Sequence, residues 1–332
     1  MTELSRRDLL RIGAATTAGA AATTWIGSGT ALAAGRPFLP YGRRSYFRRP
    51  LRDPRINWDR TRTFRAFMAS HPDQRDFDHP RLNGLDDNPW GTPYAMGRAK
   101  HPIWRLTGDL NEEVARLGRR GFHAPAWLGR VLTGTSDSPL CVVDRASGFT
   151  MFCNNAERVG RREIRGDAVS IFFHDSNGLD QRHRRSNSSR NFSSRGRIPD
   201  AMVIREDLVS HGIANDTDLG HVLHMFFVET RTRDGHKGPM INEEDDNYGF
   251  GAQGERIAID PRINLRRRRL SPSAMVIART LQNHGCYLGD NSGSQSALKM
   301  EQENDVRPVW RGHRLHRDSL RALSWKDFVV LR

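Results

Sequence analysis

A strand-like segment at residues 221–231 carries the clearest candidates for acid–base chemistry. It opens on His221 and ends on Glu229 and Arg231, with mostly apolar residues between them. Side chains alternate between the two faces of a strand, so these three are expected to share one face. His224 is expected on the other. We predict that His221 acts as a general base and that Arg231 holds a substrate carboxylate. The alternative is a structural histidine bonded to a neighbouring backbone carbonyl.

His174 adds a second candidate histidine, at the end of a predicted strand over residues 167–175. Together with His221 and Glu229 it is expected to complete an acid–base group or, as an alternative, a metal site. The chain contains 13 histidines, but their spacing includes no HExxH or paired-ligand motif. The sequence therefore predicts no bound metal and no cofactor.

A polar loop at residues 176–197 is rich in serine, asparagine and arginine and contains almost no apolar residues. On a sandwich fold such a loop overhangs the face of a sheet. A cation placed there neutralises the carboxylate of an acidic sugar while a base removes the adjacent proton. A mobile, solvated loop is the alternative. The predicted substrate-binding residues are Arg182, Arg184, Arg185 and Arg195.

The charge of the chain is strongly positive and rests almost entirely on arginine. The formal net charge is +14, and lysine occurs only at positions 100, 237, 299 and 326. Arginine presents a planar fork that binds carboxylate or phosphate through two hydrogen bonds. The excess predicts a polyanionic partner, such as acidic polysaccharide, cell-wall polymer, lipid headgroups or nucleic acid. Arginine usage that reflects a GC-rich genome is the alternative.

Cys141 and Cys153 flank a sequence typical of a β-hairpin. A five-residue loop at 145–149 places the two directly opposite each other, and a cross-strand disulfide is then expected in an oxidising compartment. A loop that differs by one residue makes the pair diagonal instead. No CxxC or clustered Cys/His spacing indicates a zinc site.

Residues 1–33 contain the parts of an export signal in the right order. Arg6 and Arg7 precede a weakly apolar run rich in Ala, Gly and Thr, which ends at a small-x-small sequence over residues 31–33. The stretch resembles a bacterial twin-arginine signal peptide. That resemblance implies export of the folded chain by the twin-arginine translocase, to the periplasm or the extracellular space. A membrane anchor is the alternative, but neither this run nor any later segment is apolar for long enough to span a bilayer stably.

After the signal, composition divides the chain into three parts. Residues 34–69 are rich in arginine and contain four prolines, which predicts an extended arm. Its aromatic residues, Tyr46 and Trp58 among them, either stack on sugars or bases or pin the arm to the fold. Residues 70–305 contain short strands, with helices expected over 109–120 and 272–285, so a β-sandwich with a few short helices is expected. Residues 306–332 form a basic C-terminal tail.

Five motifs stand in order between residues 86 and 303: DDNPWGTPYA, SPLCVVDRASGFTMF, the strand that begins at His221, GAQGERIAIDPRINL and LSPSAMVIARTLQNHGCYLGDNSG. Together they resemble the motifs of a largely uncharacterised family of bacterial secreted β-sandwich proteins. The resemblance implies a mainly β, jelly-roll or concanavalin-like sandwich of the kind found near carbohydrate-active modules. It brings no catalytic motif, and the tyrosine-bearing strand motifs of alginate-lyase sandwiches are missing, which weakens a lyase assignment.

Three hypotheses about function follow from these patterns. The leading one is an exported β-sandwich that binds, and in its catalytic form cleaves, an acidic polysaccharide. The competing one is a protein without enzymatic activity that binds the cell envelope or another polyanion. The third is a metal-dependent enzyme that folds before export.

Overall fold

The structure of the chain is a computed structural model that describes residues 37–85, 88–108, 120–135, 137–176 and 202–332. The chain divides into two compact units, Met1–Phe38 and Leu39–Arg332, and the following description concerns the second. The predicted signal at 1–33 and nearly all of the predicted helix at 109–120 lie outside the described residues. So do the predicted loop residues Arg182, Arg184, Arg185 and Arg195. Within the described residues no helix is long and apolar enough to cross a membrane.

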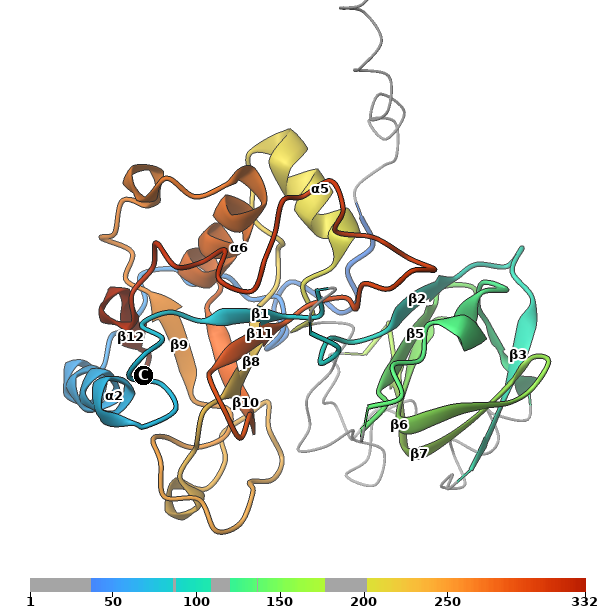
Figure 1. The fold of residues 1–332 in the computed structure, drawn as a ribbon, viewed down its shortest axis with the longest axis horizontal. Coiled ribbons are helices and arrows are strands. Elements are labelled where there is room, and N and C mark those ends of the chain that lie inside the picture. Colours follow the sequence, from blue (N-terminus) through green and yellow to red (C-terminus); the bar gives the residue numbers. More distant parts are fainter. Residues whose placement is uncertain (1–36, 86–87, 109–119, 136, 177–201) are drawn as a thin grey trace, which may run out of the picture. The chain divides into compact units, whose positions relative to one another are not determined.

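Two mixed sheets of six strands each organise the second unit (Figure 1). The first sheet contains, in spatial order, β1 (Arg81–Asn83), β11 (Ala297–Lys299), β8 (Leu223–Phe227), β10 (Cys286–Asn291), β9 (Arg256–Ile259) and β12 (Phe328–Val330). Its central strands β8 and β10 run parallel, whereas β9 and β12 continue the sheet in antiparallel fashion. Both central strands are almost wholly buried, as expected for a parallel pair covered on both faces.

The second sheet contains, in spatial order, β2 (Tyr94–Gly97), β5 (Leu140–Asp144), β6 (Phe149–Gly160), β7 (Glu163–Phe173), β3 (Ile103–Gly108) and β4 (Phe122–His123). The strands β5, β6 and β7 are antiparallel, and β2 and β3 join them in parallel at the two sides. The sheet curls until its edge strand β4 meets β2. A Cβ atom added to Gly97 would lie only 1.9 Å from the carbonyl oxygen of His123.

Two helices pack together over the first sheet, α5 (Glu206–Asn215) and α6 (Pro272–Asn283). The predicted helix at 272–285 is thereby confirmed, with Ser271 capping it and Pro272 in its first turn. A Cβ atom added to Gly212 would lie 2.6 Å from a methyl group of Val276, so the absence of a side chain allows the two helices to approach closely. Figure 1 shows them side by side. The described residues also contain four short 3-10 helices, η1 (Leu128–Arg130), η4 (Thr232–Asp234), η5 (Leu265–Arg268) and η6 (Trp325–Asp327).

The predicted extended arm at 34–69 is wrong in its last third, where α2 (Trp58–Ser70) forms. Asn57 caps this helix by accepting a hydrogen bond from a backbone N–H of its first turn. Phe64 and Met68 lie four residues apart on its buried face. The prolines that suggested an extended chain all precede the helix, so they do not interrupt it.

The two ends of this unit are parts of the fold rather than separate appendages. Phe47 of the arm is fully buried, whereas Tyr46 and Trp58 are exposed, so only some of the aromatic residues pin the arm. The segment 306–332, expected as a basic tail, buries Trp325 and supplies the edge strand β12.

The hairpin of β5 and β6 confirms the sequence prediction but changes the position of its cysteines. Its turn occupies residues 145–148, one residue fewer than the loop that would place the cysteines opposite each other. Cys141 lies opposite Phe152, and Cys153 lies opposite Leu140. Adjacent residues of a strand face opposite sides of the sheet, so the two cysteines point away from each other. The predicted Cys141–Cys153 disulfide is therefore wrong.

The predicted mainly β class, with a few short helices, is confirmed. The connection order of a jelly roll or concanavalin-like sandwich stays a prediction. The parallel pairs β8–β10, β2–β5 and β3–β7 differ from the antiparallel strands that such sandwiches contain.

Candidate anion-binding site

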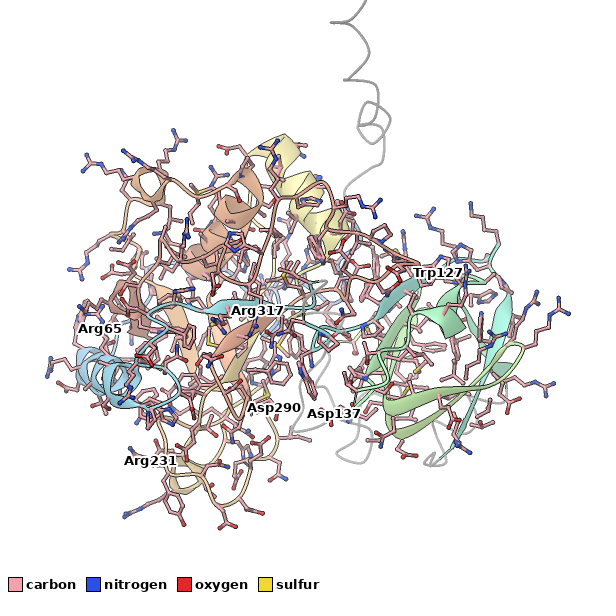
Figure 2. The ribbon with its side chains drawn as sticks, in the orientation of Figure 1. Arg65, Trp127, Asp137, Arg231, Asp290 and Arg317 are labelled. Carbon is pink, nitrogen blue, oxygen red and sulfur yellow. The ribbon has the colours of Figure 1, made fainter. Side chains whose placement is uncertain are left out.

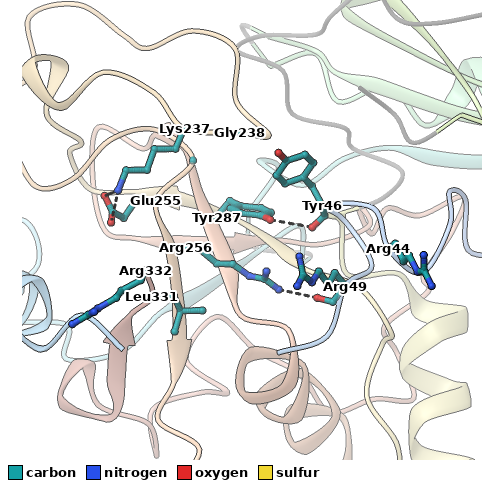
Figure 3. A pocket seen from close by; sticks show the side chains of 11 residues that line it. Arg44, Tyr46, Arg49, Lys237, Gly238, Glu255, Arg256, Tyr287, Leu331 and Arg332 are labelled. Carbon is teal, nitrogen blue, oxygen red and sulfur yellow. Dashed lines mark hydrogen bonds and ion pairs between the residues drawn. The ribbon is translucent and has the colours of Figure 1, made fainter. Parts of the chain in front are cut away.

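A cavity of about 450 Å³ lies where the N-terminal segment of the second unit crosses the first sheet (Figure 3). Its lining comes from that segment, from the loop after η4, from β9 and β10, and from the residues after β12. The lining residues are Arg44, Tyr46, Arg49, Lys237, Gly238, Gly254, Glu255, Arg256, Tyr287, Leu331 and Arg332.

Hydrogen bonds to main-chain carbonyl groups fix the N-terminal wall of this cavity. Tyr287 donates its hydroxyl to the carbonyl oxygen of Tyr46 at 3.0 Å, and Arg256 donates Nη2 to that of Arg49 at 3.0 Å. Between these points the amide of Val222 donates to the carbonyl oxygen of Phe47 at 2.7 Å. The arm is thus held on β10, β9 and the approach to β8, and its arginine side chains border the cavity.

The lining contains five cationic side chains and one carboxylate side chain, which belongs to the buried Glu255. Glu255 accepts two hydrogen bonds from Lys237 Nζ, at 3.0 and 2.9 Å, and one from Arg60 Nη2 at 2.8 Å. Its charge is therefore already shared between two cations. Among the described residues no carboxylate pairs with the four remaining cations, which are Arg44, Arg49, Arg256 and Arg332.

Arg256 is the most enclosed of these four guanidinium groups. It donates Nε and Nη2 to the carbonyl oxygen of His284, at 3.0 and 2.6 Å, in addition to its bond to Arg49. Its guanidinium carbon lies 5.4 Å from the centre of the Tyr287 ring. Burial lowers the pKa of Arg256 because the charged form loses water without gaining an anion. A charge in this position is stabilised when an anion enters the cavity.

Tyr46 gives the cavity an exposed aromatic wall, since half of its surface is open to solvent. A Cβ atom added to Gly238 would meet this ring at 3.5 Å, in ordinary contact, so the loop passes close beside it. Burial raises the pKa of Tyr287, so this hydroxyl stays protonated at neutral pH. Within the described lining there is no imidazole, and the single carboxylate is ion-paired.

The predicted general base, His221, lies outside this lining and is fully buried before β8. Its Nδ1 lies 2.9 Å from the carbonyl oxygen of Val222, which is the arrangement expected of a structural histidine. Burial lowers the pKa of His221 to about 3. An enclosed imidazole of such weak basicity is poorly suited to take a proton from a substrate.

The other predicted catalytic residues do not gather around His221. His174 follows β7 of the second sheet, with Nε2 at 3.0 Å from Thr150 Oγ1, and burial lowers its pKa to about 4. Glu229 and Arg231 do lie together, on the loop after β8, where Figure 2 labels Arg231. Both are tied to the same short stretch of chain, Glu229 through the amide of Tyr248 at 2.9 Å and Arg231 through the carbonyl oxygen of Gly249 at 3.0 Å.

The metal alternative has no cluster to support it within the described residues. No three His, Cys, Asp or Glu side chains gather there closely enough to hold an ion.

The sequence shows the arginine surplus but does not show which arginines line the cavity. Arg44, Tyr46 and Arg49 stood in the segment expected as an arm, and Tyr46 was expected either to stack on a ligand or to pin the arm. Arg256 and Tyr287 gave no signal, because each looks like an ordinary strand residue until the register of β9 and β10 is known. Their positions opposite each other in that register bring the guanidinium group beside the aromatic ring.

Comparison with known proteins adds no relative to this picture. No protein-family model matches the chain, and neither a curated protein nor a solved structure matches it significantly.

Proposed function

We propose that the protein binds an acidic polysaccharide and that the cavity receives one of its negatively charged sugars. The observation that carries this proposal is the group of four guanidinium groups without a carboxylate partner among the described residues, arranged around one cavity. Guanidinium forks fit carboxylate and sulfate oxygens, and a cavity of about 450 Å³ is of the size that holds small ligands.

The aromatic wall supports a sugar as the group that enters. The exposed ring of Tyr46 offers an apolar face beside the cations, and pyranose rings stack on such faces through their C–H groups. Nucleic acid also combines charge with stacking. Acidic polysaccharide is preferred because the proposed twin-arginine export delivers the protein to the periplasm or beyond, where such polymers occur. A jelly-roll or concanavalin-like sandwich of the predicted secreted family is part of the same proposal.

The lining supports binding more than cleavage. Glycoside hydrolysis generally uses two carboxylates, and the described lining offers one, Glu255, which Lys237 and Arg60 already engage. A lyase needs a base near the sugar, and the buried Tyr287 keeps its proton at neutral pH. We therefore place the non-enzymatic form of the hypothesis first, and expect no new reducing ends or unsaturated sugars when the protein is incubated with its ligand.

Calorimetric titration of the full chain with polygalacturonate, heparin, neutral dextran and single-stranded DNA tests the proposal. Binding to an acidic glycan is expected, with affinity that falls as salt screens the charges above ~0.1 M, and no binding to dextran. The double variant Arg44→Ser, Arg49→Ser is expected to lose affinity roughly ten- to hundredfold.

The matched control is Arg161→Ser, Arg162→Ser, which removes the same charge from the exposed turn between β6 and β7 of the other sheet. It is expected to retain nearly all the affinity. Equal losses in both double variants would show that net charge alone attracts the glycan, and would overturn the cavity as the site. Tighter binding to DNA than to any glycan would overturn the choice of ligand.

A further inference from the structure

We propose that the cavity continues as a cationic track along residues 49–55 and the adjacent Arg332, so that the ligand is a linear acidic polysaccharide bound over several sugars. This inference rests on the proposed function, because it takes the cavity as one end of the binding surface. The track consists of Arg49, Arg52, Arg55 and Arg332.

Backbone hydrogen bonds fix the path of this segment from the cavity along the edge of the first sheet. The amide of Leu51 donates to the carbonyl oxygen of Asn283 at 2.7 Å, and the amide of Arg332 donates to that of Arg55 at 2.9 Å. Ile56 forms a β-bridge with Leu331, next to the edge strand β12. Arg55 therefore lies beside Arg332, which itself lines the cavity.

Apolar contacts determine which side of the segment faces solvent. Leu51 and Ile56 pack against Val329 and Leu331 in a small cluster of their own. Arg52 and Arg55, between these two anchors, are exposed. Burial of the apolar side chains thus holds the two arginines on the solvent side of a fixed segment.

The charges of the track are uncompensated within the part of the chain that the structure describes. No ion pair engages Arg49, Arg52, Arg55 or Arg332 there. The segment itself carries one carboxylate, on the exposed Asp53, whose backbone has a φ of 46° and bends the chain between the two arginines. The excess of positive charge is left for an external anion to neutralise.

The spacing of these arginines suits a polymer rather than one small anion. Three residues of chain span at most about 10 Å, so the α-carbons of Arg49 and Arg52, and those of Arg52 and Arg55, lie within about one Debye length of each other at moderate salt. They therefore attract one polymer together. A ligand confined to a cavity of about 450 Å³ is too small to contact Arg52 and Arg55 as well.

Titration with uronic acid oligosaccharides of increasing length, from one sugar upward, tests the track. The variant Arg52→Ser, Arg55→Ser is expected to bind the monosaccharide as the unchanged chain does, and to bind long oligosaccharides roughly three- to thirtyfold more weakly. Its affinity for long chains is also expected to depend less on salt. The control is again Arg161→Ser, Arg162→Ser, and the melting temperature of each variant reports whether its fold is retained.

The outcomes separate this inference from the proposed function. If Arg44→Ser, Arg49→Ser weakens binding but Arg52→Ser, Arg55→Ser leaves the affinity for long chains unchanged, the track is overturned and the cavity stands. If neither pair of substitutions affects binding of any length, both are overturned. If affinity grows with the length of DNA and exceeds that for uronic acid chains, the track is a nucleic-acid surface and the polysaccharide is overturned.

Discussion

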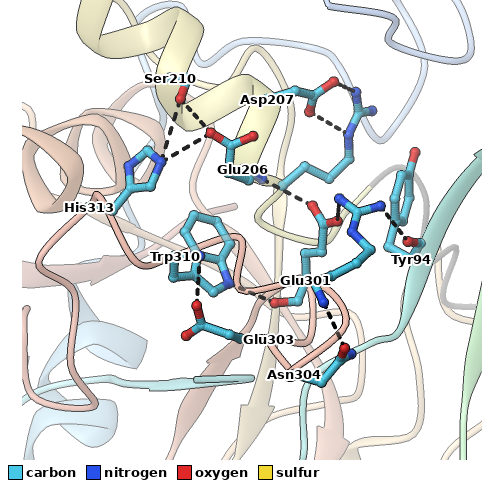
Figure 4. Close-up of polar contacts among 11 residues, drawn as sticks. Tyr94, Glu206, Asp207, Ser210, Glu301, Glu303, Asn304, Trp310 and His313 are labelled. Atoms are coloured by element: carbon cyan, nitrogen blue, oxygen red, sulfur yellow. Dashed lines mark hydrogen bonds and ion pairs between the residues drawn. The ribbon is translucent and has the colours of Figure 1, made fainter. Parts of the chain in front are cut away.

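Two regions of the second unit use arginine beside aromatic rings, and they differ in whether the charge is paired. In the network around Glu301 (Figure 4), Arg205 donates to both carboxylate oxygens of Asp207 at 2.9 and 2.6 Å. In the same network Arg307 pairs with Glu301 at 2.8 Å. In the cavity of Figure 3, the hydrogen bonds of Arg256 to described residues all go to main-chain carbonyl oxygens. The arginines of the first region are ion-paired with carboxylates, which indicates a structural role. Arg256 of the second region has no such carboxylate among the described residues, so its charge is available to a ligand.

The remaining contacts of the network join elements that are distant in the sequence. His313 Nε2 lies 3.1 Å from Glu206 Oε1 at the start of α5, and its Nδ1 lies 3.1 Å from Ser273 Oγ in α6. Trp310 donates its indole N–H to the carbonyl oxygen of Glu301 at 2.8 Å. These contacts attach the segment after β11 to both helices. The network therefore has a structural role that requires no ligand.

The largest expected effect comes from breaking the paired region. Glu301→Ala leaves Arg307 and the amide of Glu206 without their carboxylate, and is expected to lower the free energy of unfolding by about 3–5 kcal/mol. Urea denaturation measures this change. Glu301→Gln is the control, since it keeps the shape and one acceptor and should cost clearly less. A loss below about 1 kcal/mol for Glu301→Ala would remove the contrast with the cavity.

His221 extends the comparison to a buried base to which no anionic side chain of the described residues is hydrogen-bonded. Burial holds its pKa at about 3 in the folded protein, below its ordinary value of 6.5, so the unfolded chain binds the proton more readily. The free energy of unfolding therefore decreases as the pH falls below 6.5, by about 2 kcal/mol at pH ~5. His221→Gln should flatten this part of the stability profile, whereas His316→Gln, at an exposed site, should leave it unchanged. An unaltered profile in His221→Gln would show that His221 does not stay neutral.

Glu255 is the residue of the cavity lining that, like Glu301 of the network, is a buried carboxylate paired with cations. Glu255→Gln removes the only acidic side chain of the described lining, so affinity for an acidic oligosaccharide should rise roughly threefold to tenfold. Stability should fall at the same time, because Lys237 and Arg60 lose their partner. Calorimetric titration and urea denaturation of the same sample measure both changes. A variant that loses affinity would show that Glu255 orients the cations for the ligand instead of opposing it.

Tyr46 is expected to give the smallest effect. Tyr46→Ala removes the exposed ring but keeps the main-chain carbonyl group that accepts the hydrogen bond from Tyr287. Affinity should therefore fall roughly threefold, with little change in stability. Tyr46→Phe should bind as the unchanged chain does in the same titration. Equal losses in both variants would assign the contribution to the hydroxyl group and not to stacking.

The fold could be predicted where the local sequence decides the structure. The hairpin, the strand that contains Leu223 and the helix capped by Ser271 follow from turn length, apolar runs and capping residues. The pairing of β8 with β10 could not be predicted in this way, because parallel partners are chosen by contacts across the whole unit. The helix α2 was missed because the preceding prolines outweighed the Asn57 cap and the spacing of Phe64 and Met68.

The candidate site was harder to predict than the fold, for a related physical reason. A histidine at the end of a strand suggests acid–base catalysis because of its chemistry. The pKa of His221, however, depends on its burial, and its burial depends on the residues that pack over it in the folded chain. The arginine surplus predicts an anionic partner only as a class of charge and does not say which residues would bind it. An arginine stays unpaired when no carboxylate lies near it in the folded chain. The positions of the carboxylates in space could not be predicted from the sequence alone.

The walls of the cavity come from opposite ends of the second unit, with Arg44 and Arg49 near its start and Arg332 at its last residue. Contacts between such distant segments form late in folding, because a long loop must close first. A nascent chain that still lacks β12 has no complete cavity, whatever the state of its other strands. Capture by an immobilised acidic glycan should therefore report that folding has brought the segment with Arg44 and Arg49 together with the residues after β12.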